Sequence, residues 1–575
     1  ASLIRKQSGS IWTNYIGSSV DNSVMNIGEL NVLYEVDLDL LQCTARYTKS
    51  NLENTYDQPR DRYALDVKNK LMNIKLGDSY PSIDPYAING HHVRGVNFNF
   101  NLGPLSLDII KGNTARAIQG DPSNGAMAFT GIDSSTNNLI ISLSRNNYTF
   151  QQELFASKIA FRLGNKFYWD INYIKVDDNI VTVSREIADA TIMISTSDSI
   201  YSIRYDSLLN NFTSIFGAND SINLPTKNWI GTKPQDNFIY GSNIKFGFDN
   251  SHIQLHSGFS ISFFNRNKWN NLQSISELDT FAVDTTLDGL FLGSLQLDTT
   301  INLSQYEDYF SFGINQQPMV PFIFQKNGAG IINILNMSNL NRYIKLQLRY
   351  LGHRVELGSR RNGPDYYSIL NPYLKTNFTE KYLTDRLNLF KNKLLLYYKQ
   401  SKTTEGLYSE QTSSSEIRKS SFNISLFPGP DMPTFNFGFS SSNRSNNENK
   451  IIDQITFFNP DSTEIETITF IRREETINNL INISTTNRYQ LWGDQTLSLS
   501  ILLFDQKDKV VENLDKDTLL SIGYLPKDGT SESYGITLKS IYNNYWESTV
   551  YLNASYYDYG HENFGYYQQR NLRNI

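Results

Sequence analysis

The chain has 575 residues, a formal net charge of −6, 39% hydrophobic residues and 13% aromatic residues. Its charges are spread without a basic block, which argues against nucleic-acid binding, and a single cysteine, Cys43, excludes an intramolecular disulfide framework and a cysteine-based zinc cluster. No window approaches about 18 consecutive apolar residues, so we predict no helical membrane span. Few hydrophobic but many aromatic residues are typical of a membrane β-barrel with aromatic girdles, or of a β-sandwich with tyrosine-rich binding loops.

The N-terminal part of the sequence predicts a tail followed by strands. Residues 1–28 are polar and unpatterned, and we expect a polar tail. A first long strand is predicted over 31–47, with a bulge where its apolar register shifts, and a second over 63–76. A first residue other than Met, Ala1, is compatible with signal-peptide removal, and equally with an expressed fragment.

Two hairpins follow in the first half of the chain. The Gly103-Pro104 turn pairs apolar residues with apolar residues across 96–109. Over 155–173, both apolar runs are odd-numbered, so the connection must hold an odd number of residues, and residues 164–166 fit. The opposite face of that hairpin is polar and charged.

The stretch 237–263 has the clearest strand pattern in the chain. With the exception of Ile239, its apolar residues are even-numbered from Phe238 to Phe248, and they are odd-numbered from Ile253 to Phe263. A hairpin that turns at Asn250-Ser251 pairs nearly every residue with one of its own kind. Each strand then runs about 11 residues, the length that crosses a bilayer as a tilted strand.

The second half of the chain repeats this pattern. Hairpins are predicted over 387–396 and 534–554, and further strand candidates lie at 421–427, 434–440, 476–490, 496–504, 519–524 and 564–572. Three segments are too long for ordinary hairpin loops or are rich in Pro and Gly, and we expect them to be long loops or inward-folded segments: 77–95, 177–236 and 265–340.

These patterns together predict an all-β chain. We expect a single transmembrane antiparallel β-barrel of about 14–18 strands over residues 29–575, with long loops. No linker rich in Pro, Ser or Gly divides the sequence, which favours one closed sheet over an array of soluble domains.

The polar face of the predicted strands supplies the candidate site residues. Alternation with the apolar face predicts that they point into the lumen of the barrel. These lumen-facing candidates are Lys158, Arg162, Asp170, Asn172, Lys245, His256 and Lys539. If 77–95 folds inward, His91, His92 and Arg94 could line a constriction; the alternative is an exposed turn.

Signals for catalysis and metal binding are weak. His252 and His256 share a face of a strand but lie about 13 Å apart at roughly 3.3 Å per residue, too far for one metal ion. With six histidines and neither a nucleophile elbow nor a zinc-binding helix motif, we expect no enzyme activity, no metal and no cofactor.

Several short stretches resemble the large, mostly uncharacterised outer-membrane barrels of Bacteroidota-type bacteria, and more weakly the translocon barrel of the type IX secretion system. The resemblance rests on Leu76-Gly77-Asp78 with Gly90 and Val93-Arg94-Gly95, on YIKVDD at 173–178, on PQDN at 234–237 and on GPDYYSILNPYL at 363–374. It implies membrane and compartment rather than an activity. Such barrels often finish with an aromatic residue, whereas this chain ends at Ile575.

We therefore expect a bacterial outer-membrane barrel that acts as a porin-like or loop-gated channel, with 177–236 and 265–340 narrowing its mouth. One alternative is a scaffold or export component of an outer-membrane complex, and another is a soluble, secreted all-β glycan-binding protein. The expected partners are the lipid bilayer and lipopolysaccharide, together with other outer-membrane or periplasmic proteins in the scaffold alternative.

Overall fold

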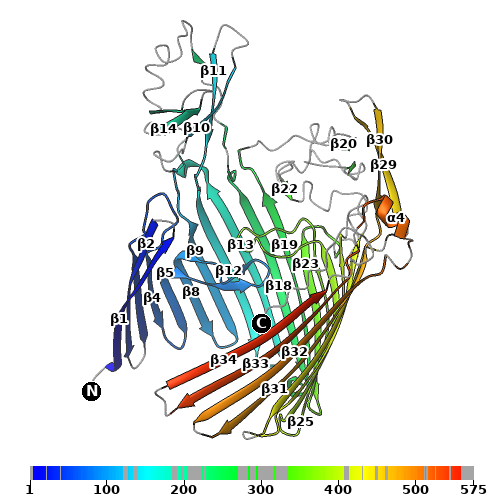
Figure 1. Cartoon of the computed structure of the whole chain (residues 1–575). Coiled ribbons are helices and arrows are strands. Elements are labelled where there is room, and N and C mark those ends of the chain that lie inside the picture. Colours follow the sequence, from blue (N-terminus) through cyan, green and yellow to red (C-terminus); the bar gives the residue numbers. More distant parts are fainter. Residues whose placement is uncertain are drawn as a thin grey trace, which may run out of the picture.

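The structure is a computed structural model of the whole chain (Figure 1). The residues it describes are 4–20, 23–38, 41–120, 127–133, 139–183, 191–195, 200–204, 222–223, 228–229, 231–269, 283–284, 293–294, 316–317, 335–406, 414–429, 432–446, 448, 451–459, 464–491, 493–510, 512, 514, 516–524, 526–542 and 546–558.

One sheet of 22 strands dominates the fold (Figure 1). Its long strands pair antiparallel with the next long strand along the chain, as tight turns require. They are β1 (Ile4–Val20), β2 (Ser23–Leu38), β3 (Gln42–Ser50), β4 (Arg62–Lys68), β5 (Met72–Ser79), β8 (Val93–Leu102), β9 (Leu105–Ala115), β12 (Gln151–Leu163), β13 (Phe167–Asn179), β18 (Asp236–Phe248), β19 (Ile253–Asn265), β23 (Leu340–Tyr350), β24 (His353–Asn362), β25 (Phe378–Leu389), β26 (Leu394–Glu405), β27 (Ser415–Leu426), β28 (Thr434–Ser445), β31 (Glu475–Gln490), β32 (Asp494–Asp508), β33 (Gly529–Tyr542) and β34 (Trp546–Asp558).

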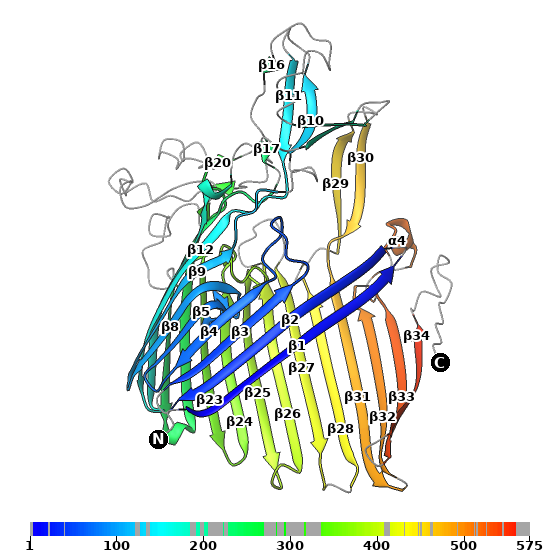
Figure 2. The same ribbon diagram turned by 90° about the vertical axis from the view of Figure 1, so that its left-hand side faces the viewer.

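Shorter elements accompany this wall. β22 (Gln316–Gln317) adds to β19, and β6 (Ser82–Asp84) pairs with β7 (Ile88–Asn89). At the end of the wall with the long connections lie β10 (Met127–Asp133), β11 (Leu139–Arg145), β14 (Thr191–Ser195), β15 (Ile200–Arg204), β16 (Ile222–Asn223), β17 (Asn228–Trp229), β20 (Val283–Asp284), β21 (Gly293–Ser294), β29 (Ile452–Asn459), β30 (Glu464–Ile471) and the helix α4 (Lys516–Ser521) (Figure 2).

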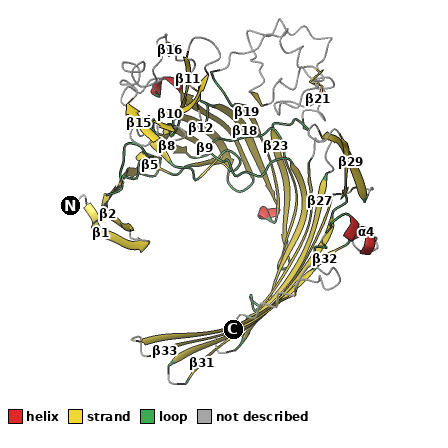
Figure 3. Ribbon diagram, turned by 45° about the horizontal axis from the view of Figure 1, so that its top comes forward, coloured by secondary structure: helices red, strands yellow, loops and turns green. Residues whose placement is uncertain are grey.

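The sheet curves around a common interior, as the view in Figure 3 shows. Among the described residues, β1 pairs only with β2 and β34 pairs only with β33. Short turns join the strands at one end of the wall, and long connections join them at the other (Figure 1). This arrangement confirms the predicted all-β antiparallel class.

The five predicted hairpins form in the predicted register. Phe248 pairs with Ile253 and Phe238 with Phe263, as the parity change in this stretch requires. The other pairs are Leu102 with Leu105, Leu163 with Phe167, Leu389 with Leu394, and Tyr534 with Ala554.

Elsewhere the local predictions need correction. Residues 4–20, expected as a polar tail, form β1, whose backbone pairs with β2 along its length. The strand expected over 31–47 is divided between β2 and β3, and that over 63–76 between β4 and β5. At the second division, the Asn69 side chain accepts hydrogen bonds from the backbone of Leu71 and Met72, which builds a turn.

Two further predictions also differ from the structure. Part of the strand expected over 519–524 belongs to α4. The main sheet has 22 strands rather than the predicted 14–18, because two predicted strands are each divided and because β1, β22, β23 and β24 were not among the predicted strands. The strand candidate 564–572 and most of 177–236 and 265–340 lie outside the described residues.

The two faces of the sheet differ in chemistry. Exposed apolar side chains that lie opposite one another on neighbouring strands form one continuous face, which we call the outer face. Its members include Ile159 at 60% exposure, Trp169 at 43%, Ile536 at 45% and Leu552 at 60%. The inner face is mostly polar and contacts the segments that fold into the interior. No helix among the described residues is long and apolar enough to cross a membrane.

Candidate functional site

The connection between β5 and β8, residues 80–92, folds onto the inner face, and we call it the first inward segment. The segment contains a tight turn at residues 84–87. Asp84 Oδ1 accepts a hydrogen bond from Tyr86 N at 2.8 Å, and Asp84 O accepts one from Ala87 N at 3.2 Å. Pro85 suits the second position of such a turn. Inward folding was one of the two alternatives expected for 77–95.

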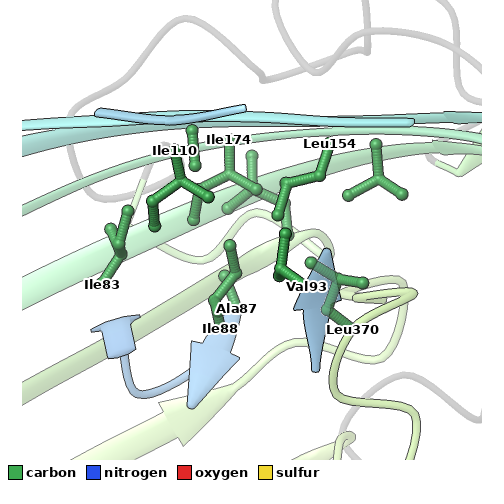
Figure 4. Close-up of a cluster of buried hydrophobic side chains, with 11 residues drawn as sticks. Ile83, Ala87, Ile88, Val93, Ile110, Leu154, Ile174 and Leu370 are labelled. Carbon is green, nitrogen blue, oxygen red and sulfur yellow. The ribbon is translucent and has the colours of Figure 1, made fainter. Parts of the chain in front are cut away.

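A small apolar core holds this segment against the wall (Figure 4). Ala87 and Ile88 are fully buried. They pack with Ile83 of the same segment and with side chains of the wall strands and of one other segment: Val93, Ile110, Leu154, Ala156, Ile174, Val176, Ile239 and Leu370. Close packing of this kind fixes the position of Asp84 beside the wall.

The connection between β24 and β25, residues 363–377, is a second inward segment. Ser368 Oγ donates to Ala87 O at 2.9 Å, which joins the two inward segments directly. Asn237 on β18 holds the second segment to the wall, since its side chain donates to Tyr367 O at 3.3 Å and accepts from Ile369 N at 3.2 Å. Both segments therefore lie on one side of the interior.

Polar side chains of β12 and β13 meet the first inward segment in a buried cluster, which we call the Asp84 cluster. Asn172 Nδ2 donates to Asp84 Oδ2 at 3.3 Å. Lys158 Nζ donates to Ile83 O at 3.1 Å and lies 3.5 Å from Asp170 Oδ2. Asp84, Asp170 and Asn172 are each at most 2% exposed. Lys158 thus pairs with the Asp170 carboxylate beside the almost fully buried side chains of Asp84 and Asn172.

Tyrosine hydroxyl groups extend the cluster across the neighbouring strands. Asn243 Nδ2 donates to Asp170 Oδ1 at 2.9 Å and accepts from the Tyr343 hydroxyl at 3.0 Å. The Tyr343 ring fills the space above Gly258, where an added Cβ would lie 2.7 Å from it. The Tyr366 hydroxyl of the second inward segment lies 2.9 Å from Ser260 Oγ. The network therefore joins both segments to the wall.

Burial decides the protonation of the groups in the inward segments. It raises the pKa of the Asp84 carboxyl, and the negative charge of Asp170 adds to the rise. Burial also raises the pKa of the Tyr366 hydroxyl well above its usual value, so this hydroxyl keeps its proton. A protonated Asp84 is the form that the docked segment favours.

We expect the first inward segment to loosen as the pH rises. Because the pKa of Asp84 is higher in the docked segment, protonation of Asp84 stabilises docking. This stabilisation is complete below the ordinary carboxyl pKa of 3.8 and is lost as the pH rises through the raised pKa. With Cys43→Ser as background, thiol labelling of Ala87→Cys should become faster from about pH 4 to about pH 8, after correction for thiol reactivity with the exposed Leu351→Cys.

The matched control for this prediction is Asp84→Asn, which keeps the turn and imitates the protonated acid. The corrected labelling rate in that background should be flat with pH. An equal pH dependence in both backgrounds would show that another group controls docking.

The lumen-facing candidates occupy the inner face, and the structure brings most of them together. Lys158, Asp170 and Asn172 belong to the Asp84 cluster. Lys245 pairs with His256 across β18 and β19. Nearby, the Arg162 guanidinium lies 5.4 Å from the centre of the Tyr168 ring. Lys539 is distant on β33, where it pairs with Glu547 at 2.6 Å.

The three constriction candidates are not arranged as expected. Arg94 lies on the outer face with Val96, because cross-strand pairing places it opposite Asp78. Arg94 Nε lies 2.8 Å from Asp78 Oδ1, and His92 Nε2 lies 2.7 Å from the same atom. Both are thus tied to the wall. His91 is half-buried, and burial together with the neighbouring His92 lowers its pKa.

Sequence reasoning did not select Asp84, Asn237 or Tyr366 as functional residues. A signal for Asn237 and Tyr366 existed, since the stretches that resemble outer-membrane barrels include PQDN at 234–237 and GPDYYSILNPYL at 363–374, whereas none of these stretches includes Asp84. A third such stretch, 173–178, supplies Ile174 and Val176 of the core. Three stretches far apart in the sequence thus meet at the two inward segments.

The pair His252 and His256 does not form a site. His252 lies in the turn before β19, with its ring stacked on Tyr350 at 5.3 Å. His256 Nε2 lies 3.3 Å from Gln254 Oε1. Within the described residues, no group of three or more His, Cys, Asp or Glu could hold a metal ion.

The chain is similar to several solved structures at low sequence identity. No protein-family model matches the chain, and no curated protein matches it. Similar solved structures include OpdQ of Pseudomonas aeruginosa, with 9% identity over 83% of this chain and 95% of that one at a TM-score of 0.31. A BenF-like porin from Pseudomonas fluorescens Pf-5 has 8% identity over 78% and 96% at 0.31. OmpT expressed in the outer membrane of Vibrio cholerae has 6% identity over 84% and 98% at 0.24.

Proposed function

We propose that the chain is a bacterial outer-membrane β-barrel that acts as a porin-like or loop-gated channel. The observation that supports this proposal best is the division of one curved sheet into an apolar outer face and a polar inner face. A soluble sandwich would bury its apolar face in a core, whereas this sheet leaves it exposed.

The outer face has the composition that a lipid environment requires. Along β12, the exposed residues Phe155, Ile159 and Leu163 alternate with inner residues. Strands β33 and β34 repeat this pattern with Ile536 and Leu552. In water such a surface would associate, and in a bilayer it contacts lipid tails. The proposal includes closure of the wall between β1 and β34, since a free sheet edge in the hydrocarbon layer would leave backbone groups unpaired.

The interior supports a gated conduit. Charged inner-face residues such as Lys245 and Arg354 line cavities that suit water. The two inward segments cover one side of the interior and narrow the path. The hydrogen bond from Ser368 to Ala87 joins the two segments, so a movement of one segment alone would break it. We propose that these segments are the gate.

Two measurements test the proposal in sequence. The protein should require detergent for extraction and purification, and the purified chain should produce stepwise ion currents in planar bilayers. Recovery from the aqueous fraction without detergent would contradict the membrane location. Folded protein that inserts but conducts no current would contradict the channel and favour the alternative, a barrel that scaffolds or exports partner proteins.

A further inference from the structure

A cluster of cationic side chains occupies the inner face near the short turns. We call it the basic inner patch, and its members are Arg162, Lys245, Lys345, Arg349, Arg354, Arg386 and Lys399. Cross-strand pairing places them on one face. Arg162 leads through Tyr168, Lys245 and His256 to Lys345, and Arg349 leads through Arg354 to Arg386. Lys399 lies opposite Thr384, two residues before Arg386 on β25. The patch spans β12 to β26.

The charge of this patch is unbalanced. We compared the inner-face residues that lie opposite one another across the strands of the patch. Among these residues, the seven cations are accompanied by one carboxylate, Glu356. Glu356 is already engaged, because it accepts hydrogen bonds from Gln347 at 2.7 Å and Tyr382 at 2.8 Å and lies 3.9 Å from Lys345. The whole chain carries a formal charge of −6, so the positive charge of the patch is opposite in sign to the net charge of the protein.

Two cavities open onto the patch. One of about 760 Å³ is lined by Lys245, Arg349 and Arg354, with Asn165 and Gln254 beside them. A second, of about 400 Å³, shares Lys245 and Asn165 and adds Arg162. Among the described residues, no carboxylate lies within ion-pair distance of Lys245, Arg349 or Arg354. Their charge is therefore available to a solute in the cavity.

We propose that the basic inner patch binds soluble anions that carry two or more phosphate or carboxylate groups. Neighbouring strands lie about 5 Å apart, and alternate residues along a strand about 7 Å apart, so one multivalent anion can contact several cations at once. Arginine guanidinium groups recognise phosphate and carboxylate oxygen atoms through paired hydrogen bonds. The inference rests on the proposed function in one respect, which is that the interior of the barrel must be filled with water.

The test is calorimetric titration of the full chain in neutral detergent with tripolyphosphate, and with citrate as competitor. Binding should be measurable at low salt, weaken with added NaCl, and be at least about tenfold weaker in Arg349→Gln/Arg354→Gln. The matched control is Lys391→Gln/Lys393→Gln, which removes the same charge at the same end of the wall, in the β25–β26 turn. Its affinity should stay within about twofold of the original.

Several outcomes would overturn the inference. They are absent binding to the folded original chain, unchanged affinity in the arginine double variant, or equal loss in the lysine control, which would indicate unspecific attraction. Displacement of tripolyphosphate by anionic phospholipid in the micelle would assign the patch to a lipid headgroup instead. Since the titration needs no current, binding without conductance contradicts only the channel, and conductance without binding contradicts only the anion site.

Discussion

Replacing Ile536 with arginine is expected to destabilise the folded protein by about 2–4 kcal/mol, the cost of a cation on the lipid face of a barrel near the bilayer midplane. Ile536 lies near the middle of β33, is 45% exposed, and pairs with Leu499 and Leu552 on the outer face. Urea unfolding in lipid vesicles, followed by tryptophan fluorescence, measures the change.

The control for this prediction is the next residue. Thr537 lies on the inner face of β33, opposite Ser498. Thr537→Arg inserts the same side chain at the same depth but towards the interior, and we expect a change below about 1 kcal/mol because water solvates the charge. Equal destabilisation by the two variants would contradict the assignment of lipid and lumen faces.

Replacing Ile88 with aspartate is expected to release the first inward segment and raise the conductance of the channel. Ile88 is fully buried in the core beneath that segment. Deleting a buried isoleucine side chain costs about 2–5 kcal/mol, and an unpaired buried charge adds to it. A cost of this size shifts the balance between docked and undocked segment by more than about thirtyfold. Single-channel recording in planar bilayers measures the result.

Ile88→Val is the matched control, since it removes one methylene group and costs only about 0.5–1.5 kcal/mol. Its conductance should match that of the original chain. Circular dichroism should show an intact sheet in both variants, because the first inward segment contributes only β6 and β7 and no wall strand. Unchanged conductance in Ile88→Asp with loss of docking, shown by thiol labelling at Ala87→Cys, would contradict the gating role.

Much of the wall could be predicted from the sequence, for a physical reason. Period-two alternation reports directly which side chains face lipid and which face water, so the pairing of Phe238 with Phe263 follows from parity alone. The same rule predicted that Lys158, Asp170 and Lys245 share one face. It failed for β1, whose sequence has no clear alternation and which is defined by its backbone pairing with β2.

The interior could not be predicted in this way. Asp84 lies 88 positions before Asn172 in the sequence, and Ala87 lies 281 positions before Ser368, and no periodicity reports contacts at such distances. Arg94 is an opposite case. The sequence suggested that it lies in a loop and lines a constriction, but its pairing with Asp78 places it on the outer face. The sequence by itself determined the strands and their two faces, because alternation is local. Only the tertiary structure decided what fills the interior, because that depends on which segments fold back onto the wall.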